Sequence, residues 1–129
     1  MKSLKRDWQL RIVYATLATL CLICIGLPAY TQTRYDAARD LVARTQEDLR
    51  RAADFTKVKK DERERVENAQ KHLSDFDRGL TRNKFDKDKL NDAIEDLKNV
   101  VEHNTLGGED RDALTRDLGD LRAMRARHD

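Results

Sequence analysis

The stretch NKFDKDKL, residues 83–90, sets two aspartates among lysines and comes nearer to a metal-binding loop than any other part of the sequence. A calcium loop of the helix–loop–helix type needs carboxylates at positions 1, 3 and 5, glycine at position 6 and glutamate at position 12. Counted from Asp75, the glycine comes one position early, at Gly79, and position 12 is Asp86. Nearby arginine and lysine side chains would also repel a cation. The sequence therefore predicts no calcium site here.

A helix start accounts better for the same residues. With Asp86 as the N-cap, its carboxylate accepts a backbone N–H of the first turn, and Phe85 and Leu90 occupy the two positions of a hydrophobic staple. Asp88 then lies in the first turn, where negative charge interacts favourably with the helix dipole. We predict a helix that begins at about Lys87.

Other residues that could carry catalysis or bind a metal have no suitable neighbours in sequence. The histidines His72, His103 and His128 have no partner at metal-ligating spacing, and we interpret them as solvated helix residues. Ser74 has no histidine–aspartate pair or glycine-rich turn to activate it. Carboxylates alternate with Arg and Lys, which is typical of a salt-bridged surface. We predict no catalytic, cofactor-binding or metal-ligating residue, no small-molecule substrate and no enzymatic activity.

The densest basic cluster lies near the middle of the chain. It comprises Lys57, Lys59 and Lys60, extended by Arg50, Arg51, Arg63 and Arg65. Such a cluster could bind anionic lipid or polymer, but acidic residues interrupt it. A solvated helix face is therefore the simpler interpretation.

Composition limits the function classes further. The chain has 129 residues, of which 39% are charged and 5% aromatic, so it has room for one domain with a small core. The excess of positive charge lies before Ile12, and the rest of the chain is close to neutral with its signs interleaved. A compact enzyme is disfavoured, and no large basic surface for nucleic acid is expected.

An apolar segment follows the basic N-terminus. Ile12–Leu27 contains no charged residue, so we expect it to enter a membrane. Together with the helix-ending Pro28 and small residues, it fits a secretory signal peptide that is cleaved after Ala29 or Thr31. Residues 32–129 would then be a charged, amphipathic helical domain in the periplasm or outside the cell.

The alternative is an uncleaved anchor over residues 8–30, with Trp8 and Tyr30 at the two membrane interfaces. The helical domain would then be held at the inner membrane, outside the cytoplasm. The C-x-x-C spacing of Cys21 and Cys24 would suggest redox chemistry or a zinc site in polar surroundings. Both lie within the apolar run, so we interpret them as small apolar residues of the signal or anchor helix.

Four amphipathic helices are predicted beyond the apolar segment, at about residues 34–54, 61–81, 87–103 and 109–127, because apolar residues recur there at steps of three and four. The residues expected to face inward are Tyr35, Ala38, Val42, Leu49, Ala52 and Phe55, then Val66, Ala69, Leu73, Phe76 and Leu80, then Leu90, Ile94 (beside Ala93), Leu97 and Val101 (beside Val100), and finally Leu114, Leu118, Leu121 and Met124. Asp40 with Arg44 and Glu47 with Arg51 have the spacing of ion pairs on an exposed helical face.

The junction between the first two helices leaves two interpretations. Residues 55–62 contain neither Gly nor Pro, so one long helix over residues 34–82 is an alternative to two helices. The apolar stripe shifts phase there and Thr56 interrupts it, which favours a break. Asp61, with Glu64 three residues on, is then predicted to cap the second helix.

Each apolar stripe is too narrow to be buried by its own helix, so the helices must pack together. The predicted fold class is all-α: a small antiparallel helical bundle of three to four amphipathic helices after an N-terminal signal or anchor helix, residues 1–31. The apolar side chains only roughly balance the conformational entropy of folding. We therefore expect a protein partner, or a homo-oligomer, that contacts the apolar stripes.

The run VENAQKHLSDFDRGLTRNKFDKDKLNDAIEDLKNVVEHNTL, followed by RDALTRDLGDLRAMR, resembles small exported helical proteins of acidobacterial type. The resemblance covers about residues 34–127 and implies export and a helical bundle, with no functional residue carried over. We predict a non-enzymatic exported envelope protein that acts through helix-mediated protein–protein or self-association. The alternative is a single-pass, membrane-anchored accessory subunit of a membrane complex.

Overall fold

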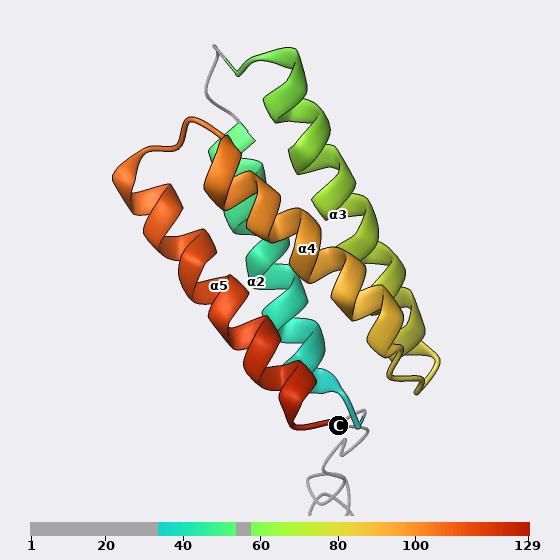
Figure 1. Cartoon of the computed structure of the whole chain (residues 1–129). Helices are drawn as coiled ribbons and strands as arrows, with labels where there is room; N and C mark the ends of the chain where they lie inside the picture. The colour runs from blue at the N-terminus through green and yellow to red at the C-terminus, as the bar shows by residue number, and fades with distance from the viewer. Residues whose placement is uncertain (1–33, 54–57) are drawn as a thin grey trace, which may run out of the picture. The chain divides into compact units, whose positions relative to one another are not determined.

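The computed structural model describes residues 34–53 and 58–129, and the regular elements in these ranges are four α-helices with no strand. They are α2 (Asp36–Ala53), α3 (Lys60–Thr81), α4 (Lys87–His103) and α5 (Gly108–Ala126). Successive helices run in opposite directions, and α2 and α4 each pack against both α3 and α5 (Figure 1). The predicted all-α class is confirmed. The predicted signal or anchor helix lies outside the described residues.

Each helix contributes one apolar stripe to a shared core. The buried hydrophobic residues are Tyr35, Ala38, Val42, Leu49 and Ala52 in and before α2, Val66, Ala69, Leu73, Phe76 and Leu80 in α3, Leu90, Ala93, Ile94, Leu97 and Val100 in α4, and Leu114, Leu118, Leu121 and Met124 in α5. Every predicted inward residue in the described ranges is buried except Val101, which is partly buried and packs against the core. Ala93 and Val100, predicted to lie beside the α4 stripe, are fully buried. Phe55 lies outside the described residues.

The helices α2 and α3 are separate and pack against each other, which confirms the predicted break between them. The predicted capping residue was wrong. The N-cap of α3 is Lys59, which makes no side-chain capping hydrogen bond, and Asp61 lies inside the first turn. The reason is that Arg63 N donates to Lys59 O over 3.0 Å, so the helix begins before Asp61 can cap it.

The turn from α3 to α4 is built around a left-handed residue. Asn83 has φ 57°, a conformation that Asn tolerates better than most residues. Its N–H donates to Leu80 O over 3.0 Å, while Lys84 N donates to Gly79 O over 2.9 Å, which together form a Schellman motif. Asp86 then caps α4, because its Oδ1 accepts from Lys89 N over 3.2 Å. The helix start predicted for residues 83–90 is confirmed.

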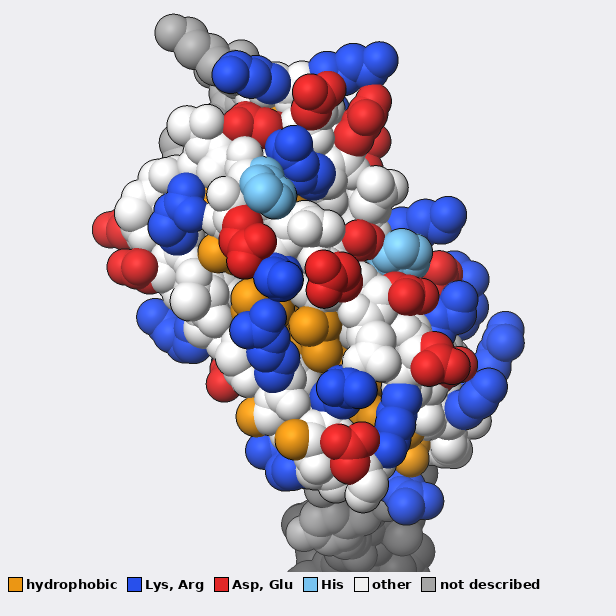
Figure 2. Space-filling view, in the orientation of Figure 1, with side chains coloured by type: hydrophobic (Ala, Val, Ile, Leu, Met, Phe, Trp, Pro, Cys, Tyr) orange, Lys and Arg blue, Asp and Glu red, His pale blue; other side chains and the backbone are white. Residues whose placement is uncertain are grey.

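The surface seen in Figure 2 carries positive and negative side chains in alternation, with a few apolar side chains between them. This distribution follows from the sequence, because charged residues fill the helical positions that do not face the core. Among the four described helices, none combines the length and the apolar character that a membrane span requires.

Candidate functional site

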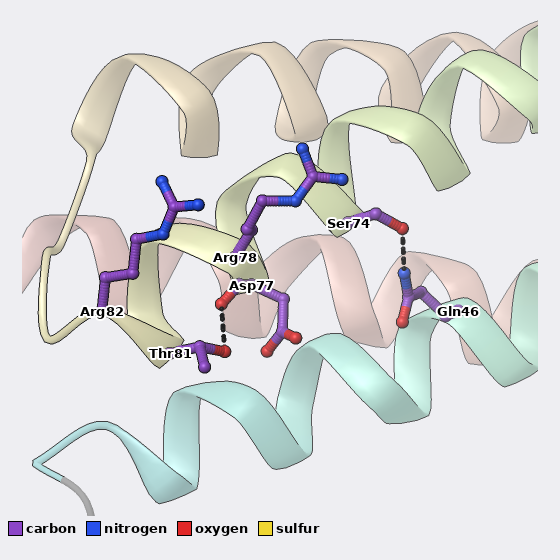
Figure 3. Close-up of a pocket in the computed structure, with 6 residues that line it drawn as sticks. All are labelled: Gln46, Ser74, Asp77, Arg78, Thr81 and Arg82. Atoms are coloured by element: carbon purple, nitrogen blue, oxygen red, sulfur yellow. Dashed lines mark hydrogen bonds between the residues drawn. The ribbon is translucent and has the colours of Figure 1, made fainter.

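A groove of about 440 Å³ between α2 and α3 contains the serine considered as a nucleophile (Figure 3). The groove is lined by Gln46, Ser74, Asp77, Arg78, Thr81 and Arg82. Ser74 Oγ accepts a hydrogen bond from Gln46 Nε2 over 2.9 Å, and Asp77 pairs with Arg39 at 3.1 Å. An amide is no base, so this contact does not activate the hydroxyl.

A second groove, of about 600 Å³, lies between α4 and α5. Asn91, Asp92, Ile94 and Glu95 line it on α4, and Arg122 and Arg125 line it on α5. The α4 wall therefore carries two carboxylates beside Asn91 and Ile94, and the α5 wall is basic. Among residues 34–53 and 58–129, neither Asp92 nor Arg122 has an ion-pair partner within 4.0 Å.

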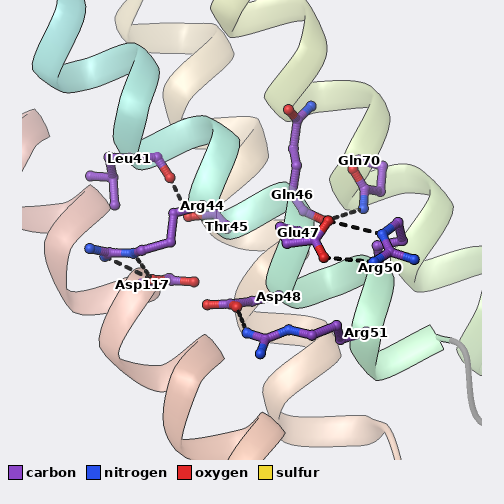
Figure 4. A network of polar contacts seen from close by, with 10 residues as sticks. All are labelled: Leu41, Arg44, Thr45, Gln46, Glu47, Asp48, Arg50, Arg51, Gln70 and Asp117. Carbon is purple, nitrogen blue, oxygen red and sulfur yellow. Dashed lines mark hydrogen bonds and ion pairs between the residues drawn. The ribbon is translucent and has the colours of Figure 1, made fainter.

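Polar side chains lie inside the interface between α2 and α5 (Figure 4). Thr45 is fully buried, Asp48 is nearly so, and the side chain of Asp117 is 1% exposed. Helical spacing explains their positions, because Thr45 and Asp48 follow Val42 at steps of three, and Asp117 follows Leu114 at the same step. Sequence reasoning missed these residues, although their spacing within the apolar stripes was the signal that could have found them.

Arg44 connects α2 to two carboxylates of α5. Its Nε donates to Asp117 Oδ1 over 2.8 Å and its Nη2 to Asp120 Oδ2 over 2.6 Å. The predicted surface pair of Arg44 with Asp40 was therefore wrong. The guanidinium lies between helices, where its planar fork binds two carboxylates at once.

The other pair predicted on α2, Glu47 with Arg51, attracts at longer range but forms no ion pair within 4.0 Å. Arg51 Nη2 instead contacts Asp48 Oδ1, and Arg50 donates to both carboxylate oxygens of Glu47, over 2.6 and 2.9 Å. Both pairs have a spacing of three residues. Arg51 therefore supplies positive charge to the buried carboxylate of Asp48, which would otherwise lack compensation.

The carboxyl groups of Asp48 and Asp117 approach each other between α2 and α5 (Figure 4). Burial raises the pKa of Asp117 to about 6, the neighbouring Asp48 carboxyl adds to the rise, and Arg44 opposes it. Oδ2 of Asp117 is buried and has no hydrogen-bond partner among the described residues. A proton on one carboxyl would let it donate to the other and would remove their repulsion. The pair can therefore take up a proton at mildly acidic pH.

A second polar network fixes the α4–α5 loop onto the start of α3. Glu62, buried at 7% exposure, accepts from Thr105 N over 2.8 Å and from Thr105 Oγ1 over 2.9 Å. Asn104 Nδ2 donates to Glu62 O over 3.0 Å, and Asn104 Oδ1 accepts from Arg65 over 3.1 Å. Arg111 donates to carbonyls at the end of α4, including Asn104 O over 3.2 Å. Each of these hydrogen bonds links two segments of the chain, so we interpret the network as one that stabilises the fold.

The structure places the predicted histidines at separate points. His72 is not merely solvated as predicted: its Nδ1 lies 2.5 Å from Asp96 Oδ2 and joins α3 to α4. His103 is the last residue of α4, and His128 stacks on Phe85 with ring centroids 3.9 Å apart. Within the described part of the chain, no three His, Cys, Asp or Glu side chains come close enough together to hold a metal ion.

Three of the six described members of the predicted basic cluster pair with carboxylates. Arg50, Arg51 and Lys60 pair with acidic residues of their own helices, and Arg65 bonds Asn104. Lys57 lies outside the described residues. The solvated-face interpretation therefore suits these side chains better than a binding patch.

No protein-family model, no curated protein sequence and no solved structure matches the chain.

Proposed function

We propose that this chain is a non-enzymatic, exported protein of the bacterial envelope, in which an antiparallel four-helix bundle follows the signal or anchor segment and self-associates. Export is supported by the uncharged run Ile12–Leu27 and by the resemblance to small exported helical proteins of acidobacterial type. Self-association is supported by the groove between α4 and α5.

The two walls of this groove carry opposite charges, which makes the surface complementary to itself. Asp92 and Glu95 are on the α4 side, and Arg122 and Arg125 are on the α5 side. A two-fold axis parallel to the groove would place the acidic wall of one copy against the basic wall of the other. The unpaired charges of Asp92 and Arg122 would then gain partners, and this relationship is the observation that carries the proposal.

The contact is assigned to the groove and not to the apolar stripes. Leu97, at the centre of the α4 stripe, is 0% exposed within its own chain. Association through the stripes, as the sequence suggested, would require the bundle to open and would expose the core to water. Association through the groove requires no such change.

A charge-swap experiment tests the proposed interface. We expect the native protein to show concentration-dependent mass in sedimentation velocity, and we expect Asp92→Arg and Arg122→Asp each to weaken association about tenfold or more. The double variant D92R/R122D should restore it, because the two walls are then complementary again. Glu102→Arg makes the same charge change outside the groove and serves as the control.

Two results would refute self-association through this groove. One is a native protein that remains a monomer at every accessible concentration. The other is a pair of single variants that associate as strongly as the native protein. Circular dichroism of each variant, which should be unchanged because these side chains are at the surface, separates interface effects from unfolding.

The form of export is tested separately. The alternative proposal, a single-pass accessory subunit of a membrane complex, shares the same bundle but keeps residues 1–31. The intact mass of the protein from the envelope fraction distinguishes a chain that begins after Ala29 or Thr31 from the full-length chain. A full-length chain found in the cytosolic fraction would contradict both forms of the proposal.

A further inference from the structure

The two ends of the bundle differ in charge. Because successive helices run in opposite directions, one end collects residues 34–39, 78–89 and 123–129, which we call the basic end. These ranges contain nine Lys and Arg against four Asp. The opposite end, made of residues 47–53, 58–65 and 102–112, contains seven Lys and Arg against nine Asp and Glu. The lower part of Figure 2 accordingly shows more blue than red side chains.

Part of the positive charge at the basic end is not compensated by ion pairs among the residues that the structure describes. Some of it is: Lys84 lies 3.5 Å from Asp86, and Lys87 lies 2.9 Å from Asp129. Arg39 and Arg78 also form ion pairs, with Asp77 and Asp75, which lie just outside the counted ranges. Arg82, Lys89 and Arg127 are all exposed, and none of them forms an ion pair with another residue in the described ranges. The end of α3, the start of α4 and the end of α5 thus each present an exposed cation.

The basic end is also the end at which the chain enters the bundle. Arg34 is the first described residue, and it lies two residues before α2 begins. The uncharged run Ile12–Leu27 precedes it by only a few residues in sequence. If that run occupies a membrane, a short tether keeps the basic end near the lipid headgroups, at high effective concentration.

We propose that the basic end of the bundle binds the anionic headgroups of a phospholipid membrane. The proposal rests on the membrane-anchored form of the proposed export, because only a chain that keeps the apolar run is held at a bilayer surface. Each Lys or Arg near an anionic surface adds to the attraction, and salt weakens it within a Debye length. An acidic protein surface could also attract these cations, but the nearby apolar run favours lipid.

Hydrogen exchange with nanodiscs tests this assignment. The probe is the protein with the N-terminus it carries in the envelope, measured with nanodiscs of phosphatidylcholine alone or with about one third phosphatidylglycerol. We expect amides of residues 78–89 to exchange several-fold more slowly with the anionic discs, and the protection to fall at high salt. Amides of residues 102–112 should be unaffected.

A pair of matched variants isolates the charge effect. The triple variant R82E/K89E/R127E should lose the protection, whereas K59E/K60E/R63E, which makes the same charge change at the opposite end, should keep it. All six side chains are exposed, so both variants should retain their helicity. Where the first variant unfolds, the corresponding glutamine variants provide the same comparison with a smaller charge change.

Equal exchange in the two kinds of disc would overturn the proposal. So would slowing at residues 78–89 that follows protein concentration in the absence of lipid, because that result would assign the basic end to a protein contact. Both outcomes are independent of the charge-swap experiment on the α4–α5 groove, so failure here and failure of the proposed self-association can be told apart.

Discussion

Arg44 of α2 donates through Nε to Asp117 Oδ1 of α5 over 2.8 Å, and this contact joins a side chain that is 49% exposed to one that is 1% exposed. The arginine thus compensates a carboxylate in the core without being buried itself. The compensation is incomplete, because the other oxygen of Asp117 faces Asp48 and has no donor among the described residues. This arrangement makes the α2–α5 interface sensitive to pH.

The first prediction concerns the pH dependence of the stability. Asp117 has a pKa of about 6 in the folded protein against an ordinary 3.8, so the folded state binds more protons than the unfolded state between these values. The contribution of Asp117 to the free energy of unfolding is therefore most favourable below about pH 4. It falls by roughly 2–3 kcal/mol as the pH rises through 6. Asp117→Asn removes the charge, so we expect it to stabilise the protein at pH 7.5 and to change little at pH 4.

Urea unfolding of both proteins across this pH range measures the effect, and the difference between them isolates Asp117 from other carboxyl groups. Asp120→Asn is the control, because Asp120 binds the same arginine but its side chain is 49% exposed. A stability difference that does not vary with pH would show that Asp117 titrates normally.

Glu62 should respond to pH in the opposite direction. Its pKa is lowered from the ordinary 4.5, first by the hydrogen bond from the Thr105 backbone N–H and then by the Thr105 hydroxyl. Its contribution to stability is therefore present above that value and is lost as pH falls through the lower, folded pKa. We expect Glu62→Gln to lower Tm at pH 7, with the difference shrinking towards pH 3. Glu64→Gln, on the exposed face, should have little effect, and equal losses in the two variants would contradict a special role of Glu62.

The turn between α3 and α4 allows a test of backbone conformation. Asn83 has φ 57°, which glycine adopts without steric cost and alanine does not. We expect Asn83→Ala to destabilise the protein by about 1 kcal/mol and Asn83→Gly to be neutral or mildly stabilising. Chemical denaturation measures both. Equal effects of the two substitutions would indicate that the left-handed conformation is not retained in solution.

The α4 stripe provides a test of the core. Leu97 is 0% exposed, so Leu97→Ala should cost about 2–5 kcal/mol, and Leu97→Asp should unfold the domain because it buries an uncompensated charge. Circular dichroism and thermal melting report both outcomes. A Leu97→Asp protein that stays helical while losing self-association would instead place this stripe in an intermolecular interface.

Much of the fold could be predicted from local information. The start of α4 is an example, because Asp86 caps it through a contact only three residues away, to Lys89 N. The inward positions, such as Leu73 and Leu97, follow from the helical period and from the cost of leaving leucine in water. The cap of α3 was missed because the N-cap is the residue at which the chain enters the helix, and local sequence does not fix that point. An aspartate such as Asp61 suits both the N-cap and the first turn.

The ion pairs show where local reasoning fails. Arg44 has an acidic residue at the correct spacing on its own helix, Asp40, yet it binds Asp117 and Asp120 across the interface. His72 likewise contacts Asp96 of another helix. Pairs on one helix contribute only tenths of a kcal/mol in water, so any better-placed partner from another helix outcompetes them.

The sequence by itself determined that the chain forms amphipathic helices and which of their faces lie inward, because hydrophobicity and helical period are properties of neighbouring residues. It also determined that an uncharged apolar segment precedes the helices. Only the tertiary structure decided that Asp48 and Asp117 meet, that opposite charges line the α4–α5 groove, and that the cations gather at one end of the bundle. These are relations between residues far apart in the chain, and they exist only once the helices have packed in a particular order and direction.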